Sequence, residues 1–210
     1  MSTVNARPTP RIRMSREARR EQLLELGFQM AQGQALETIT MEAVADAAGV
    51  SRGLIFHYFE SKGDFHLAVV RKLADRLVER TAPREDLDDP IAVLTESMAA
   101  YIDYVSGNRD GYLGLLRGSR SNDPEIREVA DGTRAVLIDR IMAYGPDLGL
   151  TASPAVEVAV AGWIAFVEET MLRWLYEPVI SRDELLSMLV TALPALAGMA
   201  DAITGPDADA

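Results

Sequence analysis

The sequence predicts an all-α protein with about nine helices. Apolar residues recur at helical spacing along most of the 210 residues, and no stretch alternates strictly between apolar and polar residues as a half-buried strand would. Helix starts are also marked. Ser181 to Glu184 has the spacing of a capping box, and Asp123-Pro124-Glu125 joins an N-cap residue to a first-turn proline and an acidic residue.

Turn and capping residues set the expected helix boundaries. Four carboxylates lie in the segment 84–90, but this segment lacks the spacing and the glycine of an EF-hand, so we expect a solvated turn there and no metal site or cofactor. The helices are expected over residues 15–32, 40–48, 51–58, 62–83, 91–106, 112–117, 124–144, 154–176 and 182 to near 198, the last with a kink at Pro194.

The composition limits the class of protein. The chain is 48% apolar, which can support a sizeable core, and it has no cysteine, which excludes disulfides, thiolate metal sites and cysteine nucleophiles. The first 15 residues are basic and contain proline without the apolar stretch of a secretory signal. No uninterrupted apolar run reaches the roughly 18–20 residues of a membrane span. We therefore expect a cytoplasmic protein with no membrane partner.

Residues 41–60, MEAVADAAGVSRGLIFHYFE, have the spacing of two helices that cross through a tight turn. Ala45 supplies the small side chain needed at the crossing, and Gly49 can adopt the positive φ that the turn requires. Val50 and Ile55 supply apolar side chains that face back toward the first helix. Any helical hairpin can place these residue types at these offsets, but the whole constellation favours a helix-turn-helix.

The residues around this turn strengthen the prediction. Thr40 and Ser51 are expected to cap the two helices, because a hydroxyl at the N-cap accepts a hydrogen bond from a free backbone amide. Ser61-Lys62-Gly63-Asp64 then opens another helix with a capping-box-like Ser-x-x-Asp, and aromatic residues occupy 56–59. The residues left toward solvent or a DNA groove are Arg52, Gly53, His57 and Tyr58.

From about residue 16 to 70 the sequence resembles the DNA-binding domain of the TetR (tetracycline repressor) family of bacterial transcriptional regulators. The matching segments are TMEAVA (40–45), AGVSRG (48–53), IFHYF (55–59) and SK (61–62). Members often carry a phosphate-binding tyrosine where Phe56 stands, so we assign Phe56 to packing and the phosphate role to Tyr58. The resemblance implies a DNA-binding domain over 1–64 and a helical ligand-binding and dimerisation domain over 65–210.

A division of roles among the DNA-facing residues follows. Arg52, the first residue after Ser51, is expected to contact a base, with a bidentate pair to guanine as the strongest form. Gly53 permits close approach of the backbone. The residues expected to hold phosphates are Thr40, His57, Tyr58 and Lys62.

The net charge of −11 is unevenly distributed and is compatible with DNA as a partner. Residues 1–62 carry eight Lys/Arg and seven Asp/Glu, whereas residues 63–210 carry thirteen and twenty-five. A polyanion is bound by a local basic face rather than by the whole chain. Arg11 and Arg13 lie in a polar start punctuated by prolines, so they either follow the minor groove or belong to a solvated tail.

The last two long helices are apolar over more than one face, which suggests a partner. We expect a homodimer through these two helices, with Leu189 in the seam, so that the two copies read two half-sites of an operator. The alternative is that they are central helices of a monomer. Elsewhere in the back half, a cavity for a small apolar or aromatic effector is expected to be lined by Met98, Tyr101, Ile102, Val105, Tyr112, Leu116, Trp163, Phe166 and Val167.

Polar groups could orient such an effector, and we nominate Tyr101, Tyr112, Arg117 and Glu169, although a tyrosine or tryptophan at helical spacing is often plain core. The leading hypothesis is a ligand-responsive transcriptional regulator, a repressor released by its effector. The alternative is an architectural DNA-binding protein without a ligand, which a filled back half would favour. We expect no enzyme, because His57 and His66 are the only histidines, lie on different predicted helices, and accompany no phosphate loop or HExxH motif.

Overall fold

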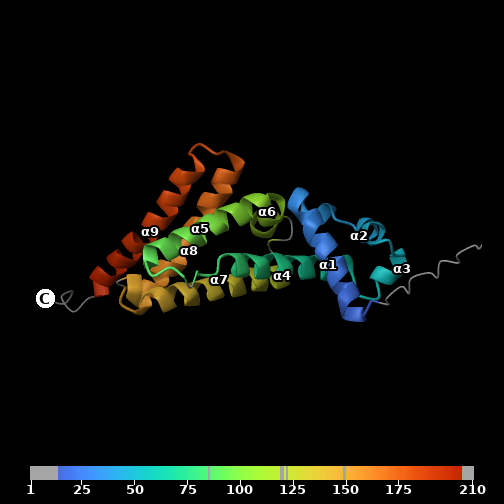
Figure 1. The fold of residues 1–210 in the computed structure, drawn as a ribbon, viewed down its shortest axis with the longest axis horizontal. Helices are drawn as coiled ribbons and strands as arrows, with labels where there is room; N and C mark the ends of the chain where they lie inside the picture. The colour runs from blue at the N-terminus through green and yellow to red at the C-terminus, as the bar shows by residue number, and fades with distance from the viewer. Residues whose placement is uncertain (1–13, 85, 119–120, 122, 149, 205–210) are drawn as a thin grey trace, which may run out of the picture.

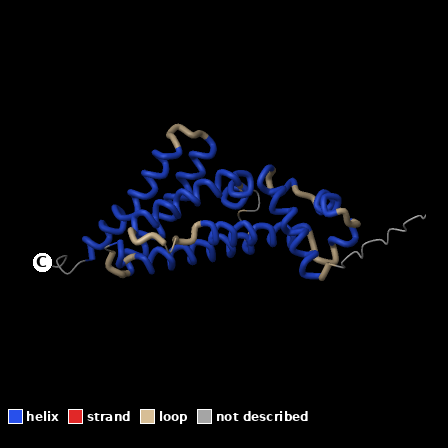
Figure 2. The backbone as a smooth tube through the Cα atoms, viewed as in Figure 1, coloured by secondary structure: helices blue, strands red, loops and turns tan. Residues whose placement is uncertain are grey.

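The computed structural model describes residues 14–204, apart from residues 85, 119, 120, 122 and 149. All regular structure in this part of the chain is helical, which confirms the predicted all-α class (Figure 2). The expected arm with Arg11 and Arg13 lies outside the described residues. The elements are α1 (Arg16–Gly33), α2 (Met41–Ala48), α3 (Arg52–Ile55), α4 (Lys62–Arg80), α5 (Pro90–Gly107), α6 (Arg109–Arg117), α7 (Pro124–Tyr144), α8 (Pro154–Tyr176) and α9 (Arg182–Thr204), with short 3-10 turns at Leu36–Thr38 and Pro146–Leu148.

The molecule is elongated, and α4 joins its two ends (Figure 1). Helices α1 to α3 form a small group at one end, while α5, α7, α8 and α9 form the larger group. α4 packs against α1 in the first group and against α7 and α5 in the second. One continuous helix therefore belongs to both halves.

Most helices begin where the capping residues predict. The Thr40 hydroxyl accepts a hydrogen bond from the Ala43 amide at 3.1 Å, and the Ser61 hydroxyl accepts one from the Asp64 amide at 3.1 Å. The Asp64 carboxylate in turn accepts from the amide of Glu60, one residue before the N-cap, at 2.9 Å, so it reaches past the Ser61 amide that the expected capping box would use. The starts of α7, α8 and α9 at Asp123, Ser153 and Ser181 are confirmed in the same way.

Helix α3 differs from the prediction at both ends. It ends at Ile55 rather than at 58, because the amides of His57 and Tyr58 bond the carbonyls three residues earlier, which closes a tight turn. The Ser51 side chain, which we expected to cap this helix, accepts no capping hydrogen bond from a described residue. The Leu54 amide, which a capping hydroxyl would bind, is already bonded to the Ser51 carbonyl at 2.9 Å.

Helix α6 begins three residues before the predicted start. The Tyr112 amide bonds the Asn108 carbonyl at 2.9 Å, so the chain turns at Asn108 and is already helical at Gly111. Gly111 lies within α6 and does not interrupt the helix, and its role is in packing. A Cβ there would lie 3.2 Å from Leu73 Cδ1 and 3.3 Å from the Ala31 carbonyl oxygen, so glycine lets α6 approach α1 and α4 closely.

Two apolar cores lie along the molecule, and α4 contributes to both. Phe65 and Val69 are fully buried in the first core, together with residues of α1, α2 and α3. Leu77, two turns further along α4, packs against the second core, which α5, α8 and α9 supply. The two cores are therefore joined through α4.

Candidate functional site

The turn between α2 and α3 has the geometry that the sequence predicts. Gly49 adopts φ 65° and ψ 36°, in the left-handed region that favours glycine. Its amide bonds the Asp46 carbonyl at 3.1 Å, and the Val50 amide bonds the Ala45 carbonyl at 3.0 Å, which is the pair of bonds of a Schellman motif. Ala45 is fully buried at the crossing. These contacts fix α3 across α2.

Arg52 stands exposed at the start of α3, with 69% of its side chain accessible. Its guanidinium forms an ion pair with the carboxylate of Glu42 on α2, at 2.7 Å. Sequence reasoning missed Glu42, because nothing in a spacing of ten residues signals contact across the turn. The pair orients Arg52 outward, and DNA binding through Arg52 must replace or share this carboxylate.

The other predicted DNA-facing residues lie around the same end of the molecule. Ser51, Gly53 and His57 are exposed, and Thr40 is half-buried at the start of α2. The ammonium group of Lys62 donates to the Glu37 carbonyl at 2.7 Å, so it ties the start of α4 to the preceding 3-10 turn. The structure thus brings these side chains together, while their contacts with DNA remain predictions.

The aromatic residues after α3 are arranged differently from the prediction. Phe56, which we assigned to packing, is 52% exposed, whereas Tyr58 is half-buried against the first core. The tight turn after Ile55 sends Phe59 into the core, where it is almost fully buried. Phe56 is the first residue after α3, so its exposed ring lies at the end of this short helix.

A partly open cavity of about 130 Å³ lies in the back half, between α4, α5, α6, α7 and α8. Its walls are overwhelmingly apolar. Of the predicted lining residues, the structure places six in the wall: Met98, Tyr101, Tyr112, Leu116, Trp163 and Val167.

Three other predicted lining residues are corrected. Phe166, Ile102 and Val105 are absent from the described cavity wall. Phe166 follows Ala165 on α8, about 100° around the helix from Val167, so its ring packs beside the second core and away from the cavity. Ile102 and Val105 are fully buried within that core.

Two tyrosines supply the hydroxyl groups that we predicted for the cavity. The hydroxyls of Tyr101 and Tyr112 are hydrogen-bonded to each other at 2.6 Å, and their rings meet edge to face with centroids 6.3 Å apart. Burial raises the pKa of both phenols, so both stay protonated near neutral pH. They can offer a ligand neutral hydrogen bonds but no charge.

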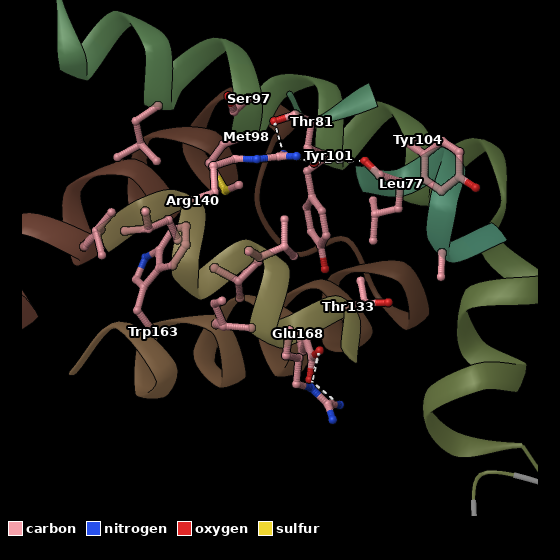
Figure 3. Close-up of a pocket in the computed structure, with 18 of the residues that line it drawn as sticks. Leu77, Thr81, Ser97, Met98, Tyr101, Tyr104, Thr133, Arg140, Trp163 and Glu168 are labelled. Carbon is pink, nitrogen blue, oxygen red and sulfur yellow. Dashed lines mark hydrogen bonds and ion pairs between the residues drawn. The ribbon is translucent and has the colours of Figure 1, made fainter. Parts of the chain in front are cut away.

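The charged groups of the cavity wall were not among the residues that we nominated. α7, from which we named no lining residue, contributes Arg134 and Arg140. α8 contributes Glu168, and Figure 3 shows Arg140 and Glu168 in the wall. The predicted polar groups Arg117 and Glu169 pair with each other outside the described cavity wall. Arg140 lies close in the sequence to the apolar residues Leu137, Ile138 and Ile141. This placement of a charged residue was the available sequence signal that α7 contributes to the cavity.

Helices α8 and α9 bury one face inside the protomer and leave another uncovered. Leu185, Leu189 and Leu193 are fully buried, and the Trp163 indole donates to the Leu189 carbonyl at 2.9 Å. The expectation that Leu189 lies in a dimer seam is therefore corrected, because its side chain packs within its own subunit. The exposed large apolar residues on these helices are Val158, Tyr176, Met188, Leu196, Met199 and Ile203.

By length and composition, the stretch Arg182–Ala200 of α9 would also suffice to cross a membrane, with 22% of that stretch buried. The expectation concerned an uninterrupted apolar run, whereas this stretch begins with Arg182, Asp183 and Glu184 and passes on its mean hydropathy. α9 instead lies against α8 and α5, and core helices of soluble proteins meet the same criterion. Within the described residues, no group of three or more His, Asp or Glu side chains could hold a metal ion.

Comparison with known proteins gives matches over both halves. The family described as "Bacterial regulatory proteins, tetR family" matches residues 23–69, and "Tetracyclin repressor-like, C-terminal domain" matches residues 90–196. The transcriptional activator FasR of Mycolicibacterium smegmatis is 28% identical over 166 residues, which cover 78% of this chain and 75% of FasR. The regulator HbdR of an Aromatoleum strain is 31% identical over 107 residues, covering 50% of this chain and 46% of HbdR.

Solved structures agree with this assignment. A tetR-family transcriptional regulator from Streptomyces coelicolor has a TM-score of 0.80 and 29% identity, covering 90% of this chain and 84% of that one. The relatives and the fold are those of transcription regulators rather than enzymes. The C-terminal family match alone spans more than half of the chain, and the helix-turn-helix match covers the turn at Gly49. The chain is therefore a member of the TetR family of transcriptional regulators.

Proposed function

We propose that this protein is a cytoplasmic, homodimeric repressor that leaves its operator when a small apolar or aromatic effector enters the cavity. The observation that carries the proposal is the cavity itself, whose wall includes Leu73, Ala74 and Leu77 of α4. The same helix supplies Phe65 and Val69 to the core of the DNA-binding half. A ligand in the cavity thus touches the helix that contributes side chains to the core shared with α2 and α3.

The effector acts by shifting a population. A ligand that binds the DNA-incompetent arrangement of α4 more tightly than the competent one lowers the affinity for DNA, and DNA lowers the affinity for the ligand by the same factor. Couplings of this kind are of the order of 1–3 kcal/mol, or about 5–150-fold. The cavity volume of about 130 Å³ suits a body of about one aromatic ring, since an engineered apolar cavity of about 150 Å³ binds benzene.

On the DNA side, α3 enters the major groove of each half-site. Arg52 reads a base after it leaves Glu42, and Gly53 allows the close approach. Thr40, Ser51, His57, Tyr58 and Lys62 hold the phosphates on either side. The exposed ring of Phe56, directly after α3, is available to meet a thymine methyl group.

The partner that covers the outer face of α8 and α9 is a second copy of the chain. Met188, Leu196, Met199 and Ile203 follow one another at helical spacing on α9, so they form one apolar stripe rather than scattered exposed residues. α8 presents Ala161, Gly162 and Ala165 as an exposed face of small residues, which allows close packing of another helix. A two-fold contact there gives a four-helix bundle and sets the spacing of the two α3 helices.

A filled back half would favour the architectural alternative, and the presence of a cavity supports the ligand-responsive proposal instead. Its wall includes Tyr101, Tyr112, Leu116 and Trp163. The direction of regulation is proposed as repression. FasR, a relative, is named an activator, so a reporter gene behind the operator is the measurement that decides the direction.

The proposal is tested by capturing and sequencing genomic DNA fragments with the purified protein. We expect a motif of two inverted half-sites whose centres are about one helical turn, or a multiple of it, apart. A library of small aromatic and aliphatic compounds is then screened for release of the captured site in gel shifts. A single, non-repeated motif would contradict the dimer, and a site that no cavity-binding compound releases would contradict ligand control.

A further inference from the structure

Arg140 differs from the other charged groups in the cavity wall because it has no carboxylate partner within the described residues. Arg134, on the same helix, is matched by Glu168 through two bonds, Nε to Oε1 at 2.9 Å and Nη2 to Oε2 at 3.0 Å. Burial raises the pKa of the Tyr101 and Tyr112 hydroxyls, so these two groups add no charge to the wall. The described wall therefore carries one positive charge beyond its ion pair, and that charge belongs to Arg140.

The hydrogen bonds of Arg140 leave one edge of its guanidinium open. Nη1 donates to the carbonyls of Val78 and Thr81, at 3.2 and 3.0 Å, and to the Thr81 hydroxyl at 3.3 Å. Nη2 donates to the Val78 carbonyl at 3.2 Å. These bonds use both hydrogens of Nη1 and one hydrogen of Nη2, at the end of the guanidinium. The Nε hydrogen and the other Nη2 hydrogen have no partner among the described residues. That side edge is the one that can bind both oxygens of a carboxylate in parallel.

The position of this edge favours an anion over a neutral group. In Figure 3, Arg140 lies beside Thr81, whereas Glu168 lies at the other side of the drawn residues, so a carboxylate at Arg140 is kept away from the negative wall group. A half-buried guanidinium whose other partners are carbonyls gains more from a charged acceptor than from a neutral one. The remaining wall near it, including Met98 and Trp163, is apolar.

We propose that the effector is an amphipathic anion: an apolar or aromatic body of about one ring that carries a carboxylate, bound by the Nε–Nη2 edge of Arg140. This inference rests on the proposed ligand control and specifies its chemistry. The other edge of the same guanidinium holds the last carbonyls of α4, where a cation is favoured by the helix dipole. Arg140 is therefore both the specificity group and a direct link between the ligand and α4.

The test compares two probes that differ only in charge, 3-phenylpropionate and 3-phenylpropionamide, by calorimetric titration of the full-length protein. We expect the carboxylate to bind wild type about tenfold or more tightly than the amide. In Arg140→Met the ratio falls to about one while the amide still binds. Arg140→Lys keeps a positive charge but lacks the pair of parallel N–H donors that binds both oxygens of a carboxylate. Its ratio of carboxylate to amide affinity should therefore lie between those of wild type and Arg140→Met.

Arg117→Met is the matched control, because this arginine pairs with Glu169 outside the described cavity wall. It should keep the wild-type ratio of carboxylate to amide binding. Equal binding of the two probes to wild type, no binding of either, or a preference that survives in both Arg140 variants would overturn the anion proposal.

Gel shifts with the captured operator distinguish a failure of the anion proposal from a failure of the proposed ligand control. If the amide releases DNA as well as the carboxylate does, ligand control stands and the anion proposal fails. If a probe binds but never releases DNA, ligand control fails while the chemistry of the site stands.

Discussion

Two glutamate substitutions on α9 distinguish the proposed dimer surface from the core of the protomer. Met199 is 64% exposed, whereas Leu189 is fully buried and its carbonyl accepts the Trp163 indole. Met199→Glu should change the free energy of unfolding of the protomer by no more than about 0.5 kcal/mol, as is usual for surface substitutions. In a dimer, however, it places an unpaired carboxylate in the covered surface, at a cost of several kcal/mol.

Leu189→Glu acts on the fold itself. Removing a buried leucine side chain costs about 2–5 kcal/mol, and an unpaired buried carboxylate adds several more. The sum is comparable with the whole stability of a typical domain, about 5–15 kcal/mol. We therefore expect Leu189→Glu to yield little folded protein at all.

Light scattering and circular dichroism measure the two effects. Wild type should be a dimer at micromolar concentration, and Met199→Glu should be a monomer with the wild-type helix signal. Val136→Glu is the control, because Val136 is an exposed apolar residue on α7, away from the α8–α9 face. The reasoning is refuted if Met199→Glu remains dimeric, or if Leu189→Glu is a well-folded monomer.

Three further measurements address the DNA contacts, the turn and the buried tyrosines. Arg52→Ala should weaken specific binding by about 1–3 kcal/mol and relax one base position, whereas Lys62→Ala should weaken binding to all sequences and lower the salt slope by about one. Gel shifts at several salt concentrations separate these effects, and an equal loss on random DNA for Arg52→Ala would contradict the base contact. Gly49→Ala should lower the free energy of unfolding by about 1–2 kcal/mol, seen in denaturant melts, because a Cβ is strained at its left-handed φ. Since burial raises the pKa of Tyr101 and Tyr112 above the ordinary 10.0, their contribution to stability should be full below pH of about 10 and fall as pH rises further. Alkaline melts of Tyr101→Phe should show a smaller loss of stability with rising pH than wild type, because only Tyr112 then contributes, and identical pH profiles for the variant and wild type would count against this reasoning.

Local signals determined the helices and the turn. Thr40, Ser61 and Asp123 are found at helix starts because a cap depends only on residues within one turn of itself. Gly49 was predictable for the same reason, since the left-handed conformation is a property of one residue. The sequence by itself therefore determined the helical class, most boundaries and the helix-turn-helix.

Tertiary packing decided which side chains carry the site. Periodicity identified two apolar faces on α9, but only its neighbours determine that Leu189 faces inward and Met199 outward. The pairing of Arg52 with Glu42, and the placing of Arg140 against the end of α4, join residues far apart in the chain. Such contacts leave no trace in local spacing, because they depend on how helices cross, and the crossing is set by the whole set of buried side chains.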